Sequence, residues 1–265
     1  MSPIHDHNRR AWDRMVQHGQ RFTRPAKDED LGNPLPQVDP LGWLGGNIAG
    51  KTLLCLAAGG GRQSAMYAMA GAAVTVVDIS PAMLELDREV AAERRLNVKT
   101  VEASMDDLPM FRNGQFDIVV HPVSTCYVPD ILSVFREVAR VTVAAGIYTS
   151  KQKTPTSSQA DVKASLRGYE LIEPYYRSGP LPAVSGSRHR EEGTLEFLHR
   201  WEEIVGGMCR AGFVIEDLVE PVHAKKEAEV ASFAHRSHFI APYVRIKARR
   251  NQDAVAIRSA ILHAS

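Results

Sequence analysis

A run of three glycines, and an aspartate at the end of the strand that follows, are the residues best suited to bind a nucleoside. The glycines, 59–61, follow the apolar run 53–57 and precede the helical stretch 62–70, and Asp78 ends the second apolar run, 74–77. Bare glycines let a ligand approach the backbone closely, and the free N–H groups at a helix start favour an anionic group. An acid at the tip of the second strand can accept hydrogen bonds from two ribose hydroxyls, as in nucleoside-binding βαβ units. This unit is therefore expected to hold a ligand that contains adenosine.

Length and composition limit the classes of protein to consider. A chain of 265 residues with 44% hydrophobic and 24% charged residues suits one large α/β domain, alone or with an appended subdomain. The net charge of +1 gives no electrostatic reason to expect nucleic acid or a membrane as a partner. Cys55, Cys126 and Cys209 are scattered, which predicts neither a disulfide framework nor a metal site. Because the N-terminus lacks the apolar core of a signal peptide, we expect a cytoplasmic protein.

Apolar periodicity and turn residues predict alternating strands and helices. Strands are expected at 53–57, 74–77, 98–103, 115–121, 147–151, 213–219 and 237–246. Helices are expected at 10–20, 62–70, 81–96, 131–141 and 194–211, with Ser80 and Asp130 as N-caps and glycines 71 and 212 closing two of them.

The chain divides into five segments by composition. We expect a leader at 1–50, a ligand-binding core at 51–151, an insertion at 152–193, the rest of the core at 194–250 and a tail at 251–265. Within the leader, residues 1–10 are expected to be loose and 22–41 irregular, because the latter stretch is rich in proline and charge. The insertion is too long for a simple connection, which indicates a functional lid.

The glycine loop resembles motif I of the class I S-adenosylmethionine-dependent methyltransferases, which has the form acid-x-G-x-G-x-G after a strand. Gly59 and Gly61 match two of the three glycine positions, whereas Cys55 stands at the acid and Ala57 at the first glycine. The Asp-x-Ser-x-x-Met pattern that starts at Asp78 and the Phe-Asp start of the strand 115–121 are also similar to the family. Further likeness to a bacterial, uncharacterised small-molecule subgroup lies in 121–124, 196–199 and 206–213.

The resemblance implies a fold, a cofactor and a binding site. The fold is a Rossmann-like α/β sheet of about seven mostly parallel strands, with an antiparallel last strand and helices on both faces. The cofactor is S-adenosylmethionine. The implied cofactor-binding residues are Trp12, Ala57, Ala58, Gly59, Gly61, Asp78, Ile79, Met83, Ser104, Met105 and His121. Ser104 takes the place of the acid that contacts the adenine amino group in the family, and Trp12 belongs to a leader that covers the methionine end.

The function implied is methyl transfer to a small-molecule acceptor, with a homodimer possible. A general base helps where the acceptor is a hydroxyl, and the candidates are His121, at a strand end, and His199. Two alternatives remain open. A methyltransferase-like module without catalysis is favoured by Cys55, Ala57 and Ser104. A nicotinamide-dependent oxidoreductase would need a third glycine, which the loop lacks, and a catalytic Tyr-x-x-x-Lys pair, for which Tyr148 and Lys151 have the wrong spacing.

Overall fold

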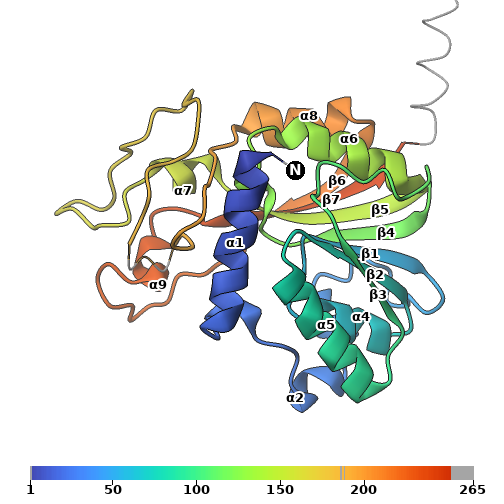
Figure 1. Cartoon of the computed structure of the whole chain (residues 1–265). Coiled ribbons are helices and arrows are strands. Elements are labelled where there is room, and N and C mark those ends of the chain that lie inside the picture. The colour runs from blue at the N-terminus through green and yellow to red at the C-terminus, as the bar shows by residue number, and fades with distance from the viewer. Residues whose placement is uncertain (1, 186, 188, 252–265) are drawn as a thin grey trace, which may run out of the picture.

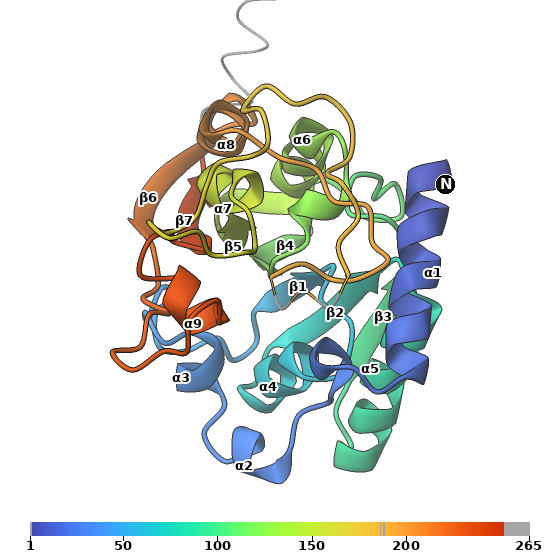
Figure 2. The ribbon, with the colours of Figure 1, turned by 90° about the vertical axis from the view of Figure 1, so that its left-hand side faces the viewer.

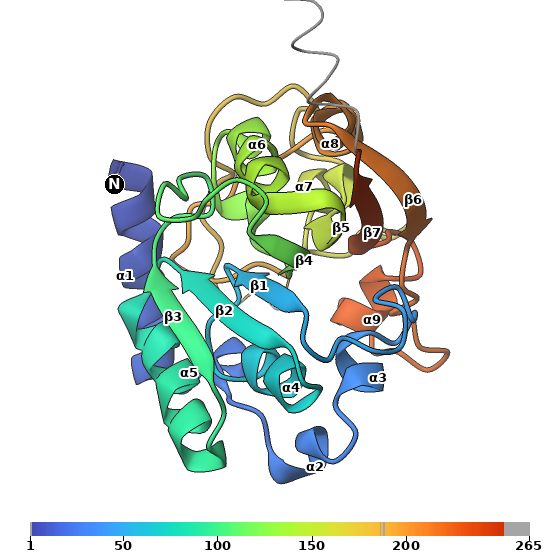
Figure 3. The ribbon, with the colours of Figure 1, turned by 90° about the vertical axis from the view of Figure 1, so that its right-hand side faces the viewer.

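The strands of the described residues form one sheet in the order β3-β2-β1-β4-β5-β7-β6 (Figure 3). The structure is a computed structural model that describes residues 2–185, 187 and 189–251. The strands are β1 Thr52–Leu56, β2 Ala73–Asp78, β3 Val98–Glu102, β4 Phe116–His121, β5 Thr142–Lys153, β6 Phe213–Val219 and β7 Tyr243–Arg250. Strands β1 to β5 pair in parallel, whereas β7 pairs antiparallel with β5 and β6. The predicted fold class is confirmed.

Helices cover both faces of the sheet because the central strands are apolar on both sides (Figure 1). Leu54 and Leu56 of β1 join a core cluster with α6 (Ile131–Val141) and α8 (Gly207–Arg210). Leu53 and Cys55 point the other way, into a second cluster with α4 (Gln63–Met69) and α5 (Pro81–Arg94). Cys55 is fully buried there, so this departure from the family motif packs as a small apolar side chain.

Two helices begin at the residues that the sequence predicts. The Ser80 hydroxyl accepts the Met83 N–H at 3.1 Å at the start of α5, and an Asp130 carboxylate oxygen accepts the Leu132 N–H at 2.9 Å at the start of α6. Gly71 follows α4 with a φ of 92°, as expected of a left-handed residue after a helix. Because α5 follows β2 and α6 follows β4, the starts of both helices lie at the carboxyl edge of the sheet.

The N-terminal segment is a helix rather than the predicted loose tail. Helix α1 (Pro3–Gln17) begins at Pro3, with Ser2 as its N-cap, and not near Arg10. Its polar side chains explain its order: Asn8 is buried, and an Asp13 carboxylate oxygen accepts a hydrogen bond from the Ser80 hydroxyl at 2.6 Å. The rest of the leader has only short helical pieces: a 3-10 turn at Arg21–Thr23, α2 (Asp28–Leu31) and α3 (Leu35–Val38).

The helix predicted to begin at Thr194 is wrong over its first turns. A π-helical turn, Glu202–Gly206, precedes α8, and the residues before it are irregular. Their backbone N–H groups serve distant partners: Leu195 donates to the Asn8 side chain at 2.8 Å and Phe197 to the Cys126 carbonyl at 2.7 Å. The apolar residues after Thr194 therefore pack from an irregular segment and not from a helix.

The last strand begins later than predicted. Helix α9 (Phe233–Arg236) and a loop occupy the region where the sequence suggested strand from Ser237, and β7 starts at Tyr243. Strand β5 is longer than predicted at both ends. The expected tail falls, beyond Asn251, outside the described residues. No helix of the described chain is long and apolar enough to span a membrane.

The insertion and α1 stand at the edge of the sheet where the parallel strands end (Figure 2). The insertion holds one helix, α7 (Pro155–Gln159), and two isolated bridges, Ala160 with Leu171 and Ser165 with Gly168.

Candidate functional site

A cavity of about 680 Å³ opens at the carboxyl ends of β1, β2, β4 and β5. Its wall includes most of the predicted cofactor residues: Trp12, Ala57, Ala58, Gly59, Asp78, Ile79, Met83, Ser104, Met105 and His121. Gly61 and His199 do not line it. Ligands of doubly wound sheets bind at this edge, so the fold positions the predicted residues as a single site.

The glycine loop is held from behind by Asp87, a residue that the sequence analysis missed. The Asp87 carboxylate accepts the backbone N–H groups of Gly60 and Gly61 at 3.0 and 3.1 Å, together with the Ser64 hydroxyl. Burial raises the pKa of Asp87 to about 7, although these hydrogen bonds act to lower it. Asp87 lies on the apolar face of α5, four residues after Met83 and three before Val90. An acid on that face was the signal for its role.

Two loop positions show why small residues stand there. A side chain at Gly59 would place its Cβ 2.7 Å from the Met83 Cβ and 2.9 Å from an Asp78 oxygen. Ala57, at the family's first glycine position, has a φ of 48°, a left-handed conformation that costs an L-residue about 1–2 kcal/mol. The loop backbone therefore keeps the shape that a glycine would adopt with less strain.

Asp78 lies at the end of β2 with its carboxylate on the cavity wall. Its two oxygens accept the backbone N–H groups of Gly59 and Ser80, each at 2.9 Å. Burial raises the pKa of Asp78 to about 6, against the lowering effect of these N–H groups. The carboxylate is thus fixed in orientation and remains available for a further donor, such as a ribose hydroxyl.

The turn after β3 brings Ser104 together with the first turn of α1. The Ser104 hydroxyl donates to Asp106 at 2.5 Å, and the other Asp106 oxygen lies 3.2 Å from His5 Nε2. Asp106 therefore supplies a carboxylate beside the position where the family acid is replaced by serine. His5 was assigned to a loose tail, so this contact could not be foreseen from the sequence.

Helix α1 covers the cavity and carries Trp12 to its wall. The Trp12 ring packs edge-to-face on Tyr127, with ring centroids 5.7 Å apart. The Asn8 amide donates to the Tyr127 carbonyl at 2.9 Å, which fixes the helix against the loop after β4. Helix α1 therefore lies at the cavity wall, and the role of the leader over the methionine end of the cofactor stays a prediction.

His121 ends β4 with one ring nitrogen bound and the other free. The Nδ1 atom lies 2.9 Å from the Tyr148 hydroxyl, and Nε2 has no hydrogen-bond partner among the described residues. The side chain is 2% exposed, and burial lowers its pKa to about 3. His199 differs, because its Nε2 donates to the Thr125 carbonyl at 3.0 Å and the ring lies off the cavity wall. Of the two predicted catalytic candidates, only His121 reaches the site.

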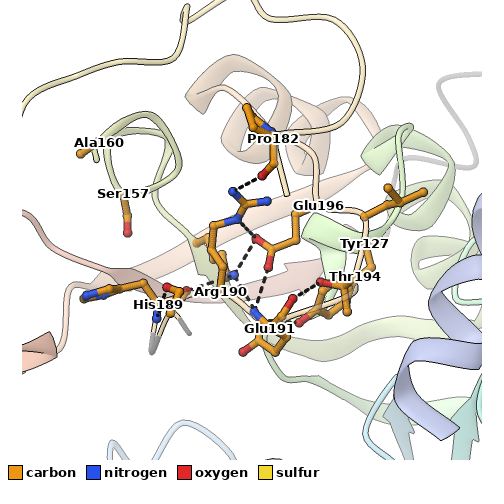
Figure 4. Close-up of polar contacts among 12 residues, drawn as sticks. Tyr127, Ser157, Ala160, Pro182, His189, Arg190, Glu191, Thr194 and Glu196 are labelled. Carbon is orange, nitrogen blue, oxygen red and sulfur yellow. Dashed lines mark hydrogen bonds and ion pairs between the residues drawn. The ribbon is translucent and has the colours of Figure 1, made fainter. Parts of the chain in front are cut away.

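A cluster of buried charges connects the insertion to the part of the cavity that β5 and β7 line. Lys153 Nζ contacts Glu196 at 2.8 Å and Glu191 at 3.4 Å, and the Tyr127 hydroxyl donates to Glu191 at 2.8 Å. The Arg190 guanidinium also contacts Glu196, at 3.2 Å (Figure 4). Only Glu191 of these charged groups lines the cavity. No local pattern indicates this cluster, because Tyr127 and Lys153 are far along the chain from residues 190–196.

Across residues 2–185, 187 and 189–251, no group of three or more His, Cys, Asp or Glu side chains is arranged to hold a metal ion.

Comparison with known proteins gives one consistent result. A family model described as a methyltransferase domain matches residues 54–149. The uncharacterized methyltransferase YbaJ of Bacillus subtilis is 34% identical over 235 residues, which cover 83% of this chain and 91% of that protein. A ubiquinone biosynthesis O-methyltransferase of Bordetella pertussis is 30% identical over 131 residues, covering 47% of this chain and 54% of that protein.

Solved structures agree at the level of the fold. An S-adenosylmethionine-dependent methyltransferase from Mesorhizobium loti superimposes with a TM-score of 0.61 at 18% identity, covering 80% of this chain and 98% of that one. A geranyl diphosphate C-methyltransferase from Streptomyces coelicolor, in complex with S-adenosyl-L-homocysteine, gives 0.60 at 18% identity over 94% and 98% of the two chains.

Proposed function

Because the chain belongs to the class I S-adenosylmethionine-dependent methyltransferases, we propose that it transfers the methyl group of that cofactor to a small-molecule acceptor. The acceptor binds in the part of the cavity that β5 and β7 line. The observation that carries this proposal is the continuity of the cavity from the glycine loop to the ends of β5 and β7. Its volume of about 680 Å³ is in the range of small-ligand sites. The Bordetella relative is named as an O-methyltransferase of ubiquinone biosynthesis, which is likewise a small-molecule reaction.

The residues in the part of the cavity beside the glycine loop and the end of β2 fit the cofactor. Gly59 leaves room for close backbone approach, and the Asp78 carboxylate is suited to ribose hydroxyls. Ile79 and Met105 offer apolar surface for the adenine ring, and Ser104 offers a hydroxyl at its edge. The cofactor supplies a methyl group that is already activated by the positive charge on sulfur.

The chain's own contribution is alignment and exclusion of water. Trp12 on α1 and Glu191 of the insertion line the cavity. The imidazole of His121 is neutral at working pH, because burial lowers its pKa to about 3. A neutral ring held at Nδ1 by Tyr148 can orient an acceptor through its free Nε2, whereas its weak basicity makes it a poor proton store.

Binding and turnover test the proposal in two steps. Calorimetry should show that S-adenosylmethionine and S-adenosylhomocysteine bind, with NAD as the negative control. Incubation with S-adenosylmethionine and a metabolite library should then release S-adenosylhomocysteine in the presence of the acceptor. Binding without turnover for any acceptor would favour the non-catalytic module. We further propose a cytoplasmic location, which suits the free cysteines 55, 126 and 209.

A further inference from the structure

Lys151 and Arg245 place two positive charges side by side on the cavity wall. They are register partners in the antiparallel pairing of β5 and β7. Like charges directly opposite each other on neighbouring strands destabilise a sheet. A ligand with negative charge between them would remove this repulsion.

Neither cation has a counter-ion in the described part of the chain. The Lys151 Nζ atom lies 4.2 Å from the ring centroid of Tyr243, and Arg245 makes no ion pair or side-chain hydrogen bond among the described residues. Burial, together with the charge of Arg245, lowers the pKa of Lys151 to about 8. The ammonium group is thus partly removed from water with only the Tyr243 ring as a favourable contact, and a bound anion would offset the remaining cost.

The carboxylates on the same wall are already bound elsewhere. Asp39 accepts the backbone N–H groups of Trp43 and Leu44 at 2.9 and 2.8 Å. Glu191 accepts from Tyr127 and pairs with Lys153. Asp78, the third acid of the wall, lies at the end of β2 and accepts the Gly59 and Ser80 N–H groups. None of these three carboxylates forms an ion pair with Lys151 or Arg245.

We propose that the methyl acceptor is an anion whose carboxylate or phosphate group binds between Lys151 and Arg245. This rests on the proposed function and names the substrate class of the same cavity. The ammonium group acts as a point charge, and the guanidinium can donate two parallel hydrogen bonds to such a group.

The position of the pair favours the acceptor over the carboxylate of the cofactor. The glycine loop and Asp78 follow β1 and β2, whereas Lys151 and Arg245 lie on β5 and β7, two and three strands away from β1. With neighbouring strands ~4.8 Å apart, these separations are about 10 and 14 Å. His121, with its free Nε2, ends the strand between the two regions.

The test is calorimetry of the full chain saturated with S-adenosylhomocysteine, titrated at pH 7 with benzoate, phenyl phosphate or benzamide. We expect at least one anion to bind at least about tenfold more tightly than the neutral amide, a difference of about 1.4 kcal/mol. The stronger of benzoate and phenyl phosphate distinguishes a carboxylate from a phosphate acceptor. Lys151→Met and Arg245→Met should each weaken that binding at least about tenfold.

A matched control is Lys247→Met, because Lys247 is also on β7 but is paired with Glu216 at 3.0 Å and does not line the cavity. It should leave anion binding unchanged. Equal binding of benzoate and benzamide, no binding of either anion, or anion binding that survives both cavity variants would overturn the inference. A collapse of S-adenosylhomocysteine affinity in those variants would also overturn it, since the pair would then hold the cofactor. If the wild-type chain fails to bind S-adenosylhomocysteine, the proposed function fails instead.

Wild-type protein provides a second measurement that needs no variant. Anion affinity should fall as pH rises through about 8, because Lys151 loses its proton there. The other groups around Lys151 do not change charge between pH 7 and 9: the pKa of His223 is lowered, that of Tyr243 is raised, and arginine stays charged. Anion affinity that is constant over this range would contradict the role of Lys151.

Discussion

The Asp87 carboxylate accepts the backbone N–H of Gly60 at 3.0 Å, so a buried acid on α5 fixes the loop that approaches the cofactor. The same carboxylate binds the N–H of Gly61 and the Ser64 hydroxyl. The loop therefore has its shape set from the protein side, and its outer surface is left for the ligand. Because Asp87 is buried, ionisation of its carboxyl group changes the free energy of unfolding.

The first prediction concerns stability and pH. The folded-state pKa of Asp87, about 7, lies above the ordinary value of 3.8. The folded protein then binds more protons than the unfolded chain between these values, so the free energy of unfolding should fall as pH rises from about 4 to 7 and level off above. Denaturant titrations at pH 5 and 8 should show that the stability difference between wild type and Asp87→Asn shrinks by about 1–4 kcal/mol at the higher pH.

The exposed Asp107→Asn variant is the control, and it should follow the wild-type pH dependence. Asp78 contributes in the same direction through its own raised pKa and is unchanged in both variants. If Asp87→Asn and wild type kept a constant stability difference from pH 5 to pH 8, the carboxyl would not titrate in this range.

The second prediction concerns cofactor affinity. Asp78→Ala should weaken S-adenosylhomocysteine binding by about 1.5–3 kcal/mol at pH 8, because charge-assisted hydrogen bonds to the ribose are lost. The loss should be smaller at pH 5, since the pKa of Asp78 is about 6 and the wild-type carboxyl is then protonated. Calorimetry at both pH values measures this. Glu102→Ala, at the register partner of Asp78 on β3, should bind normally.

The third prediction concerns backbone strain at the first position of the motif. Ala57→Gly should raise the free energy of unfolding by about 0.5–1 kcal/mol, because a φ of 48° is free of steric cost for glycine. Ala58→Gly, one residue on and without a positive φ, should bring no such gain. Chemical denaturation of both variants settles the comparison, and a destabilised Ala57→Gly protein would show that packing of the alanine methyl outweighs the strain.

The fourth prediction separates binding from turnover at His121. His121→Ala should keep S-adenosylhomocysteine affinity within about threefold, ~0.7 kcal/mol, and lower turnover about 10²-fold or more. Wild-type turnover should show no step near pH 6.5 from this residue, because its pKa is about 3. His199→Gln is the control, since His199 is off the cavity wall. Lost cofactor affinity with normal turnover at saturating cofactor would place His121 in the cofactor site.

The fifth prediction concerns the covering segments. Limited proteolysis should cut first within 160–185, where isolated bridges are the main backbone order, and later in α1, which is tied down through Asn8 and Asp13. S-adenosylhomocysteine should slow the first cuts. First cuts within β1 to α6 would contradict this order.

The features that were predicted correctly are those that depend on residues close together in the sequence. The strand, glycine loop, helix and acid from Thr52 to Asp78 are local, and parallel topology then places His121 on the same edge. Ser80 and Asp130 are readable as caps because they precede apolar-periodic helices.

The features that it missed depend on contacts between distant residues. The pairing of Lys151 with Arg245 follows from the register of β5 with β7, which no local pattern specifies. The segment after Thr194 is irregular although its apolar residues have helical spacing, because Asn8 and Cys126 accept hydrogen bonds from its backbone N–H groups. The order of the first helix likewise comes from partners beyond its own segment.

The hydrogen bonds between Asn8 and Leu195 also have a consequence for biosynthesis. The two residues are 187 positions apart, and the Asn8 side chain both donates to and accepts from the Leu195 backbone. At about 5–20 residues per second, a ribosome needs ~10–40 s to add the second partner after the first. Throughout that interval the Asn8 side chain lacks its Leu195 partner, so α1 is held only by partners made earlier, among them Ser80 through Asp13 and Tyr127 through Asn8.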